Sequence, residues 1–174
     1  MRELAVYDFK NYKENGTVGR RPSVRGVIIH DGKIAMIHSL KYDYYKFPGG
    51  GIDGDESHIE TLIREVEEEA GLVVIKETVA EYGVVIRKEK GNIDDIFIQE
   101  NFYYFCDVEE EIRNQRLDEY EAEEEFVLEW VEPAHAIEAN TKRACSESDD
   151  LIAKHRTERE ANVLKLLVDE KYFD

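Results

Sequence analysis

The chain has 174 residues, of which 42% are apolar and 36% are charged, and its formal net charge is −17. This length favours a single domain over residues 1–174, with a core large enough to fold without disulfides. The acidic balance argues against long DNA or RNA as a partner, because like charges repel. No window approaches the roughly 18 apolar residues that cross a bilayer, so no membrane partner is expected.

The cysteine content indicates a reducing compartment. Cys106 and Cys145 form neither a CxxC pair nor a zinc-binding spacing, and free thiols are typical of the cytosol. The first 16 residues lack the long apolar stretch of a signal peptide. We therefore expect a cytoplasmic protein.

Short strands are expected through the first 40 residues. Within the N-terminal segment 1–22, the sequence favours a strand or lid at 4–9 and a polar loop at 10–22. Two strands are then expected at 24–30 and 33–38. The last two are apolar runs separated by Asp31-Gly32. That dipeptide between two strands predicts a hairpin.

The segment after Pro48–Gly51 is expected to be helical over 56–70. Three glycines that follow a proline suit a bend better than a helix or a strand. The apolar side chains beyond the bend recur at i, i+3, i+4, i+7 and i+11 and make one stripe: Ile59, Leu62, Ile63, Val66 and Ala70. Gly71 is placed to cap the end of this helix.

The second half of the chain mixes strands with helices. Residues rich in Val, Ile, Phe and Tyr predict strands at 72–76, 79–87, 95–107 and 126–131. Between the last two, 108–125 is strongly acidic and is expected to be exposed. Pro133 suits the first turn of a short helix that ends at Ala139, and a polar stretch at 140–150 leads to a final C-terminal helix at 151–170. This mixture favours an α/β or α+β sandwich.

Three glutamates of the expected helix share one face. Glu65, Glu68 and Glu69 are spaced i, i+3 and i+4, about 120° from the centre of the apolar stripe. The stripe can therefore pack on a sheet while the acidic face lines a cleft. Clustered carboxylates repel one another unless a cation lies between them, and hard oxygen ligands suit Mg²⁺ or Mn²⁺. The plainer interpretation is a solvated face, since the chain has 40 acidic residues.

These glutamates belong to a longer pattern that resembles the signature of the Nudix hydrolases, GX5EX7REUXEEXGU, where U is a bulky aliphatic residue. Every defined position is matched: Gly50, Glu56, Arg64, Glu65, Val66, Glu68, Glu69, Gly71 and Leu72. The Pro48-Gly49 lead-in and the later Trp130-Val131 strand are also similar to that family. The resemblance implies an α/β/α sandwich with a mixed sheet, with the motif loop and helix at the edge of that sheet.

The resemblance also implies roles residue by residue. Glu65, Glu68 and Glu69 are the expected metal ligands and catalytic residues, and the backbone carbonyl of Gly50 is a further ligand. Glu56 and Arg64 are expected to brace the loop against the helix as an ion pair, which is a structural role.

A general base is expected, and the sequence offers several candidates for it. Glu65 or Glu69 suits this role. In some members of the family the base comes from a later loop, which here directs attention to the acidic run Glu121, Glu123, Glu124 and Glu125, with Glu124 and Glu125 singled out. Surface solvation is the simpler interpretation for each residue of that run.

No further family signature defines the substrate. Five tyrosines are candidates for stacking on a nucleobase, although alternating aromatics more often pack a sheet: Tyr42, Tyr44, Tyr45, Tyr103 and Tyr104. Arg20, Arg21 and Arg25 lie around the second strand, where they either contact phosphate or remain solvated or paired. His155 on the last helix is expected at the surface.

The expected function is the hydrolysis, with Mg²⁺ or Mn²⁺, of a diphosphate linkage in a nucleoside di- or triphosphate or a related small molecule. The alternative is a non-catalytic Nudix-like module that senses a nucleotide or binds a protein, and the intact motif favours the enzyme. Removal of 5′-terminal phosphates from RNA is disfavoured by the net charge, unless a basic groove lies beside the cleft. The sequence does not decide whether the chain forms a homodimer, which metal it prefers or which bond it cleaves.

Overall fold

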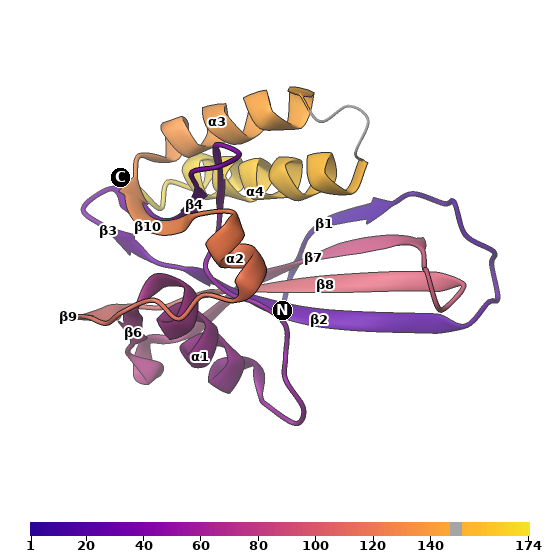
Figure 1. Ribbon diagram of the computed structural model, residues 1–174, viewed down its shortest axis with the longest axis horizontal. Helices are drawn as coiled ribbons and strands as arrows, with labels where there is room; N and C mark the ends of the chain where they lie inside the picture. The colour runs from indigo at the N-terminus through magenta and orange to yellow at the C-terminus, as the bar shows by residue number, and fades with distance from the viewer. Residues whose placement is uncertain (147–150) are drawn as a thin grey trace.

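The computed structural model describes residues 1–146 and 151–174. Its largest sheet has the strand order β1 (Glu3–Asp8), β7 (Ala80–Lys90), β8 (Ile96–Phe105) and β2 (Val18–Val27). β1 is parallel to β7 and β2 is parallel to β8, whereas β7 and β8 are antiparallel. The sheet is therefore mixed, and β2, β7 and β8 extend side by side away from the helices (Figure 1).

Two smaller sheets complete the strand layer. One has the order β10 (Phe126–Val131), β4 (Lys33–Ser39) and β3 (Ile29–His30), with β5 (Tyr44–Lys46) also paired to β4. The other pairs β6 (Leu72–Val74) with β9 (Val108–Ile112). The predicted hairpin is confirmed, since β3 and β4 are antiparallel and Asp31 and Gly32 turn the chain with φ of 49° and 73°.

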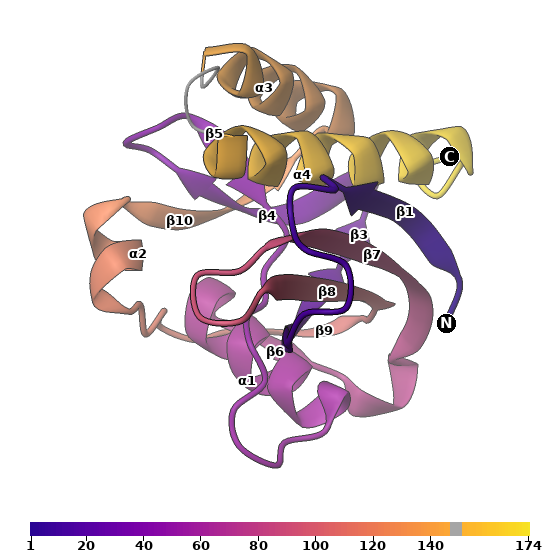
Figure 2. The same cartoon turned by 90° about the vertical axis from the view of Figure 1, so that its right-hand side faces the viewer.

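Helices cover both sides of the strands. The four α-helices of the described residues are α1 (His58–Ala70), α2 (Glu119–Glu123), α3 (Pro133–Ser146) and α4 (Leu151–Asp169). A 3₁₀ turn, η1, covers Lys76–Thr78. α1 lies on one side of the strands, and α3 and α4 pack together on the other (Figures 1 and 2). The expected α/β sandwich is thus confirmed. None of the described helices is long and apolar enough to cross a membrane.

Alternation along the strands divides the core in two. On β4, Ala35 and Ile37 belong to the core beneath α1, whereas Ile34 and Met36 belong to the core beneath α4. The neighbours Tyr44 and Tyr45 of β5 divide in the same way. Successive side chains of a strand point to opposite faces, so strands covered on both faces need apolar residues at every position.

The stripe predicted for α1 packs as expected. Leu62, Val66 and Ala70 are buried in the core on its side. The helix begins at His58 rather than at residue 56 because Ser57 is its N-cap, with Glu60 completing a capping box. Gly71 ends the helix in the left-handed conformation, at φ 68°. Both ends of α1 are therefore fixed by local sequence.

Strand pairing changes two expected boundaries in the first half of the chain. The loop expected over 10–22 is wrong for its last five residues, because β2 starts at Val18 and pairs with β8 along its whole length. The strand expected at 24–30 is divided at Ile28, since β2 ends at Val27 and Ile29 begins β3 in another sheet. Polar side chains such as Arg20 and Arg21 did not indicate this partner.

The acidic segment 108–125 is not merely exposed, because it contains β9 and α2 and buries Glu121. The helix expected to end at Ala139 continues to Ser146 as α3, so most of the polar stretch 140–150 is helical. Asn140 explains this continuation, since its buried side chain accepts from the amide of Tyr45 at 2.7 Å and donates to its carbonyl at 2.8 Å. Residues 147–150 lie outside the described residues.

His155 is not at the surface. Its side chain is 4% exposed, and its ring packs edge-on against Tyr7 at 4.3 Å and Phe9 at 5.4 Å between centroids. Burial, together with the charges of Arg159 and Arg87, lowers the pKa of His155 to about 4. The imidazole is therefore neutral in the folded chain at neutral pH.

This burial predicts a loss of stability in mild acid. Between pH 6.5 and about 4 the unfolded chain protonates His155 while the folded chain does not, so stability falls as the pH drops through this window. The loss is at most about 3 kcal/mol. Unfolding by urea at pH 7 and pH 4.5 should show a smaller loss for His155→Phe than for the parent. His30→Gln, at an exposed position, should behave like the parent, and an identical loss in all three chains would contradict the prediction.

Candidate active site

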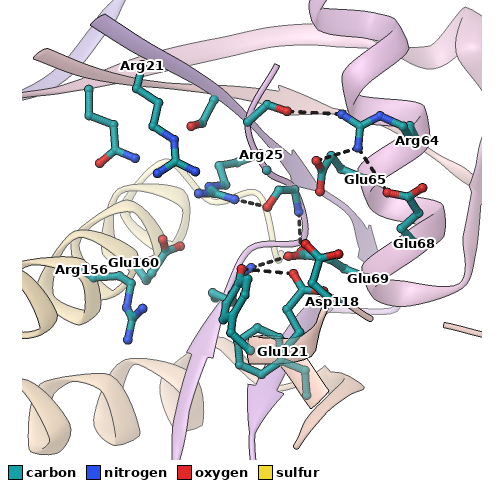
Figure 3. A pocket seen from close by; sticks show the side chains of 18 of the residues that line it. Arg21, Arg25, Arg64, Glu65, Glu68, Glu69, Asp118, Glu121, Arg156 and Glu160 are labelled. Carbon is teal, nitrogen blue, oxygen red and sulfur yellow. Dashed lines mark hydrogen bonds and ion pairs between the residues drawn. The ribbon is translucent and has the colours of Figure 1, made fainter. Parts of the chain in front are cut away.

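A cavity of about 540 Å³ lies between α1 and α4 (Figure 3). Its lining comes from β2, β5, the loop after β5, α1, α2 with the residues before it, and α4, with one residue each from β8 and β10. The structure brings the expected residues Gly50, Glu65, Glu68 and Glu69 together in this lining. Gly50 lies so close to the helix that a Cβ atom on it would meet the Glu65 carboxylate at 2.4 Å. A larger residue at position 50 would displace that carboxylate.

Glu69 is the most deeply placed of the three glutamates, with 2% of its surface exposed. One carboxylate oxygen accepts from the amide of Gly49 at 2.8 Å, and the other contacts the ammonium of Lys46. Burial opposes ionisation of Glu69, but the charges of Lys46 and Arg25 and its hydrogen bonds with Glu121 and Lys46 together outweigh burial, so the pKa of Glu69 lies below its ordinary value. Glu69 is therefore a fixed anion that ties α1 to the glycine loop.

Arg64 joins the other carboxylates to the same loop. Its Nε and Nη2 atoms each lie 2.8 Å from an oxygen of Glu56, which is a bidentate pair. This pairing holds the pKa of Glu56 at about 2. Nη1 of Arg64 also donates to Glu65 at 2.8 Å and to Glu68 at 3.2 Å. Burial raises the pKa of Glu65, and Arg64 opposes that rise.

The donor chemistry fits a hard divalent cation. Glu65, Glu68 and Glu69 supply carboxylate oxygens on one face, and Gly50 leaves room for a close approach to Glu65. In the described part of the chain, however, no three His, Cys, Asp or Glu side chains are arranged as a ready metal site. The cations that contact these glutamates are Lys46, Arg64 and Arg116, so a metal would have to compete with Arg64 for Glu65 and Glu68.

Glu121 is the residue of the acidic run that lines the cavity. Burial, followed by its hydrogen bond with Glu69, raises the pKa of Glu121 to about 7. Glu124 instead accepts from the hydroxyl of Tyr44 at 2.5 Å, Glu125 is exposed, and neither belongs to the lining. The sequence did carry a signal, since Asp118 and Glu121 have the spacing of a capping box, and the amide of Asp118 donates to Glu121 at 2.8 Å.

Arginines line the wall opposite α1. Arg21 and Arg25 enter the cavity from β2, whereas Arg20 points elsewhere and pairs with Glu100 at 3.2 Å. Arg156 and Arg159 of α4 complete this wall, and sequence reasoning did not connect that helix to the site. The five tyrosines considered for stacking are mostly packed inside the sheet layer, and among them only Tyr44 contributes to the cavity.

Comparison with known proteins identifies the family. Residues 19–154 match the NUDIX domain, so the chain belongs to the Nudix family of hydrolases. RNA pyrophosphohydrolases from Stenotrophomonas maltophilia (strain K279a) and Xylella fastidiosa are 38% and 39% identical over 56 residues. Each match covers 32% of this chain and 27% or 30% of the relative, so the similarity spans less than a third of those proteins.

Solved structures of MutT and other Nudix proteins are also similar. A MutT Nudix hydrolase from Burkholderia pseudomallei is 22% identical, with a TM-score of 0.46 over 57% of this chain and 75% of that chain. An ADP-ribose pyrophosphatase from Streptococcus suis is 18% identical, with a TM-score of 0.46 over 84% of this chain and 90% of that chain.

Proposed function

We propose that this chain is a divalent-metal-dependent hydrolase that cleaves a diphosphate linkage in a nucleotide-like small molecule by attack of water on phosphorus. The observation that carries the proposal is the meeting of Glu65, Glu68 and Glu69 with Gly50 in one cavity. Glutamates on one helix face do not by themselves indicate a metal site. Here, however, Glu69 and Arg64 hold this face against the glycine loop. Membership of the Nudix family supports the same reaction.

The chain's own residues would have distinct roles. Glu65, Glu68, Glu69 and the carbonyl of Gly50 would hold Mg²⁺ or Mn²⁺. A bound divalent cation supplies charge neutralisation for the diphosphate and acidifies a water molecule. Arg64, fixed by Glu56, would keep the loop and the helix in one geometry. The proton acceptor is one of Glu65, Glu69 and the acidic run, in which Glu121 has the position nearest the chemistry.

Turnover of a substrate panel, with the nucleotide products separated by chromatography, tests this function. The panel contains nucleoside triphosphates, oxidised nucleotides, nucleotide sugars, dinucleoside polyphosphates and a 5′-triphosphorylated RNA oligonucleotide, each with Mg²⁺, Mn²⁺ or chelator. We expect turnover of at least one class that the chelator abolishes. Metal binding without any turnover would contradict the enzyme and support the non-catalytic alternative, in which the cavity senses a nucleotide.

Metal should also stabilise the fold. Relief of repulsion among carboxylates favours the folded chain, and saturation at about 100 times Kd adds about 2.7 kcal/mol. A thermal melt with Mg²⁺ should therefore show a higher Tm than a melt with chelator. A Tm that ignores both Mg²⁺ and Mn²⁺ would favour a solvated acidic face.

A further inference from the structure

The cavity differs in charge from the rest of the molecule. Among the described residues its lining has seven basic and seven acidic side chains, whereas the whole chain has 23 basic and 40 acidic residues. Six of these seven basic residues are arginines. Arginine presents a planar fork of donors that matches the oxygens of phosphate, and it stays charged at any physiological pH. The enrichment therefore indicates an anionic ligand.

Four of the basic residues already have carboxylate partners. Lys46 pairs with Glu69, Arg64 with Glu56, Arg116 with Glu67, and Arg159 with Glu160. The other three have no carboxylate partner within 1–146 and 151–174: Arg21, Arg25 and Arg156. These three guanidinium groups are left to bind a ligand.

The contacts of these three arginines leave donors free. One Nη of Arg25 donates to the carbonyl of Gly49, and the guanidinium of Arg156 lies over the ring of Tyr44 at 4.9 Å. The Nε atoms of Arg25 and Arg156 are buried and find no acceptor among the described residues. A buried donor without an acceptor is costly, so an incoming anion would gain more here than at a solvated arginine.

A further arginine, Arg87, makes this wall still more positive. Burial lowers the pKa of Arg87, the charge of Glu89 opposes that change, and the charges of Arg159 and Arg21 add to it, so the three guanidinium groups lie close enough to repel one another. The carboxylates paired with these groups are Glu89 and Glu160, at 3.4 Å from Arg87 and in contact with Arg159. Crowded like charges that exceed their counterions favour the binding of an anion.

The glycine loop places this wall directly beside the glutamates. Gly50 faces Glu65, while Gly49 accepts from Arg25 and a Cβ atom on Gly51 would lie 3.9 Å from the guanidinium of Arg21. Figure 3 shows Arg21 and Arg25 close together in the cavity and Arg156 on α4 beside Glu160, with Glu65, Glu68 and Glu69 on the side of α1. The glutamates and the arginines therefore adjoin along Gly49–Gly51, and this arrangement suits consecutive phosphates of one substrate molecule.

We propose that Arg21, Arg25 and Arg156 form a subsite for a phosphate beyond the scissile diphosphate, which makes the preferred substrates chains of three or more phosphates. This inference rests on the proposed function, because the glutamates are taken to hold the diphosphate. A neutral sugar at this end would leave three guanidinium groups without a counterion. The substrate class is therefore a polyphosphate rather than a nucleotide sugar.

Binding of inorganic polyphosphate tests the subsite without turnover. Calorimetry with chelator present measures the binding of tripolyphosphate to the arginines without a metal. Arg21→Gln and Arg156→Gln should each weaken tripolyphosphate binding about 10-fold, the usual effect of one charge-assisted hydrogen bond. The controls are Arg20→Gln on β2 and Lys154→Gln on α4, which remove equal charges outside the cavity and should change the Kd less than 2-fold.

Kinetics separate this inference from the proposed function. Both arginine variants should lower kcat/KM for a nucleoside triphosphate about 10-fold and leave that for a nucleotide sugar within 2-fold. For a 5′-triphosphorylated oligonucleotide, kcat/KM should fall by the same factor as for the mononucleotide, because both substrates carry the triphosphate. The subsite would be overturned if kcat/KM fell equally for the nucleoside triphosphate and the nucleotide sugar. It would also be overturned if kcat/KM fell for the oligonucleotide alone. Arginine-dependent tripolyphosphate binding with no turnover of any substrate would keep the subsite and reject the hydrolase.

Discussion

Glu68→Gln and Glu69→Gln, made separately, are expected to lower turnover by about 10²- to 10³-fold. Glutamine keeps the size of the side chain but removes the anionic oxygen that would bind the metal, and loss of such an electrostatic group commonly costs 10²–10³-fold in rate. Glu69→Gln also leaves the buried ammonium of Lys46 without its carboxylate, so its loss should be the larger. Turnover with saturating Mg²⁺ is the measurement, and circular dichroism shows that each variant is folded.

A third variant on the same helix supplies the control. Glu67 carries the same charge but lies outside the cavity lining, where it pairs with Arg113 at 2.9 Å and Arg116 at 3.2 Å. Glu67→Gln should therefore keep turnover within a few-fold of the parent. If all three variants lose activity equally, the acidic face acts through general charge and not as a ligand set. Glu121→Gln and Glu124→Gln belong in the same series, and only Glu121→Gln should lower turnover.

Local sequence was enough to predict the part of the site that α1 carries. The apolar stripe, the cap at Ser57 and the end at Gly71 are all encoded within the 15 residues from Ser57 to Gly71, and they fix the rotation of the helix. Once the helix is rotated correctly, the spacing of Glu65, Glu68 and Glu69 places their carboxylates together. The first half of β2 shows the contrary case, because residues 18–22 become a strand only by pairing with residues 96–100, far along the chain.

The sequence offered Arg21 and Arg25 as possible phosphate contacts, but it could not connect them with Arg156, for the same reason. Arg21 and Arg25 come from β2, and Arg156 comes from the last helix, more than 130 residues later. No spacing connects them, and their meeting depends on how α4 packs against the sheet layer. His155 is a related case, since a single polar residue on a helix carries no sign of the ring of Tyr7 that covers it.

Gly49→Ala is expected to have the largest effect on stability in the glycine loop. Gly49 has φ of 138°, a conformation that residues with a side chain rarely adopt, and its added Cβ would lie 2.2 Å from the carbonyl oxygen of Val24. Both sides of this clash are backbone, and hydrogen bonds between β2 and the loop on either side prevent relaxation, at 2.9 Å from Val24 to Gly50 and 2.8 Å from Gly26 to Pro48. The expected loss is about 3 kcal/mol or more, measured by urea unfolding.

Alanine variants of the neighbouring glycines distinguish backbone strain from damage to the site. Gly50→Ala meets only the flexible carboxylate of Glu65, at 2.4 Å, so the side chain moves at a cost of about 1 kcal/mol or less. Turnover of Gly50→Ala should nevertheless fall, because the displaced carboxylate leaves the position proposed for a metal ligand. Gly51→Ala has nothing nearer than 3.9 Å and should unfold like the parent. A Gly50→Ala chain with full turnover would show that the closeness of Gly50 to Glu65 serves the fold alone, and the metal assignment of both residues would then fail.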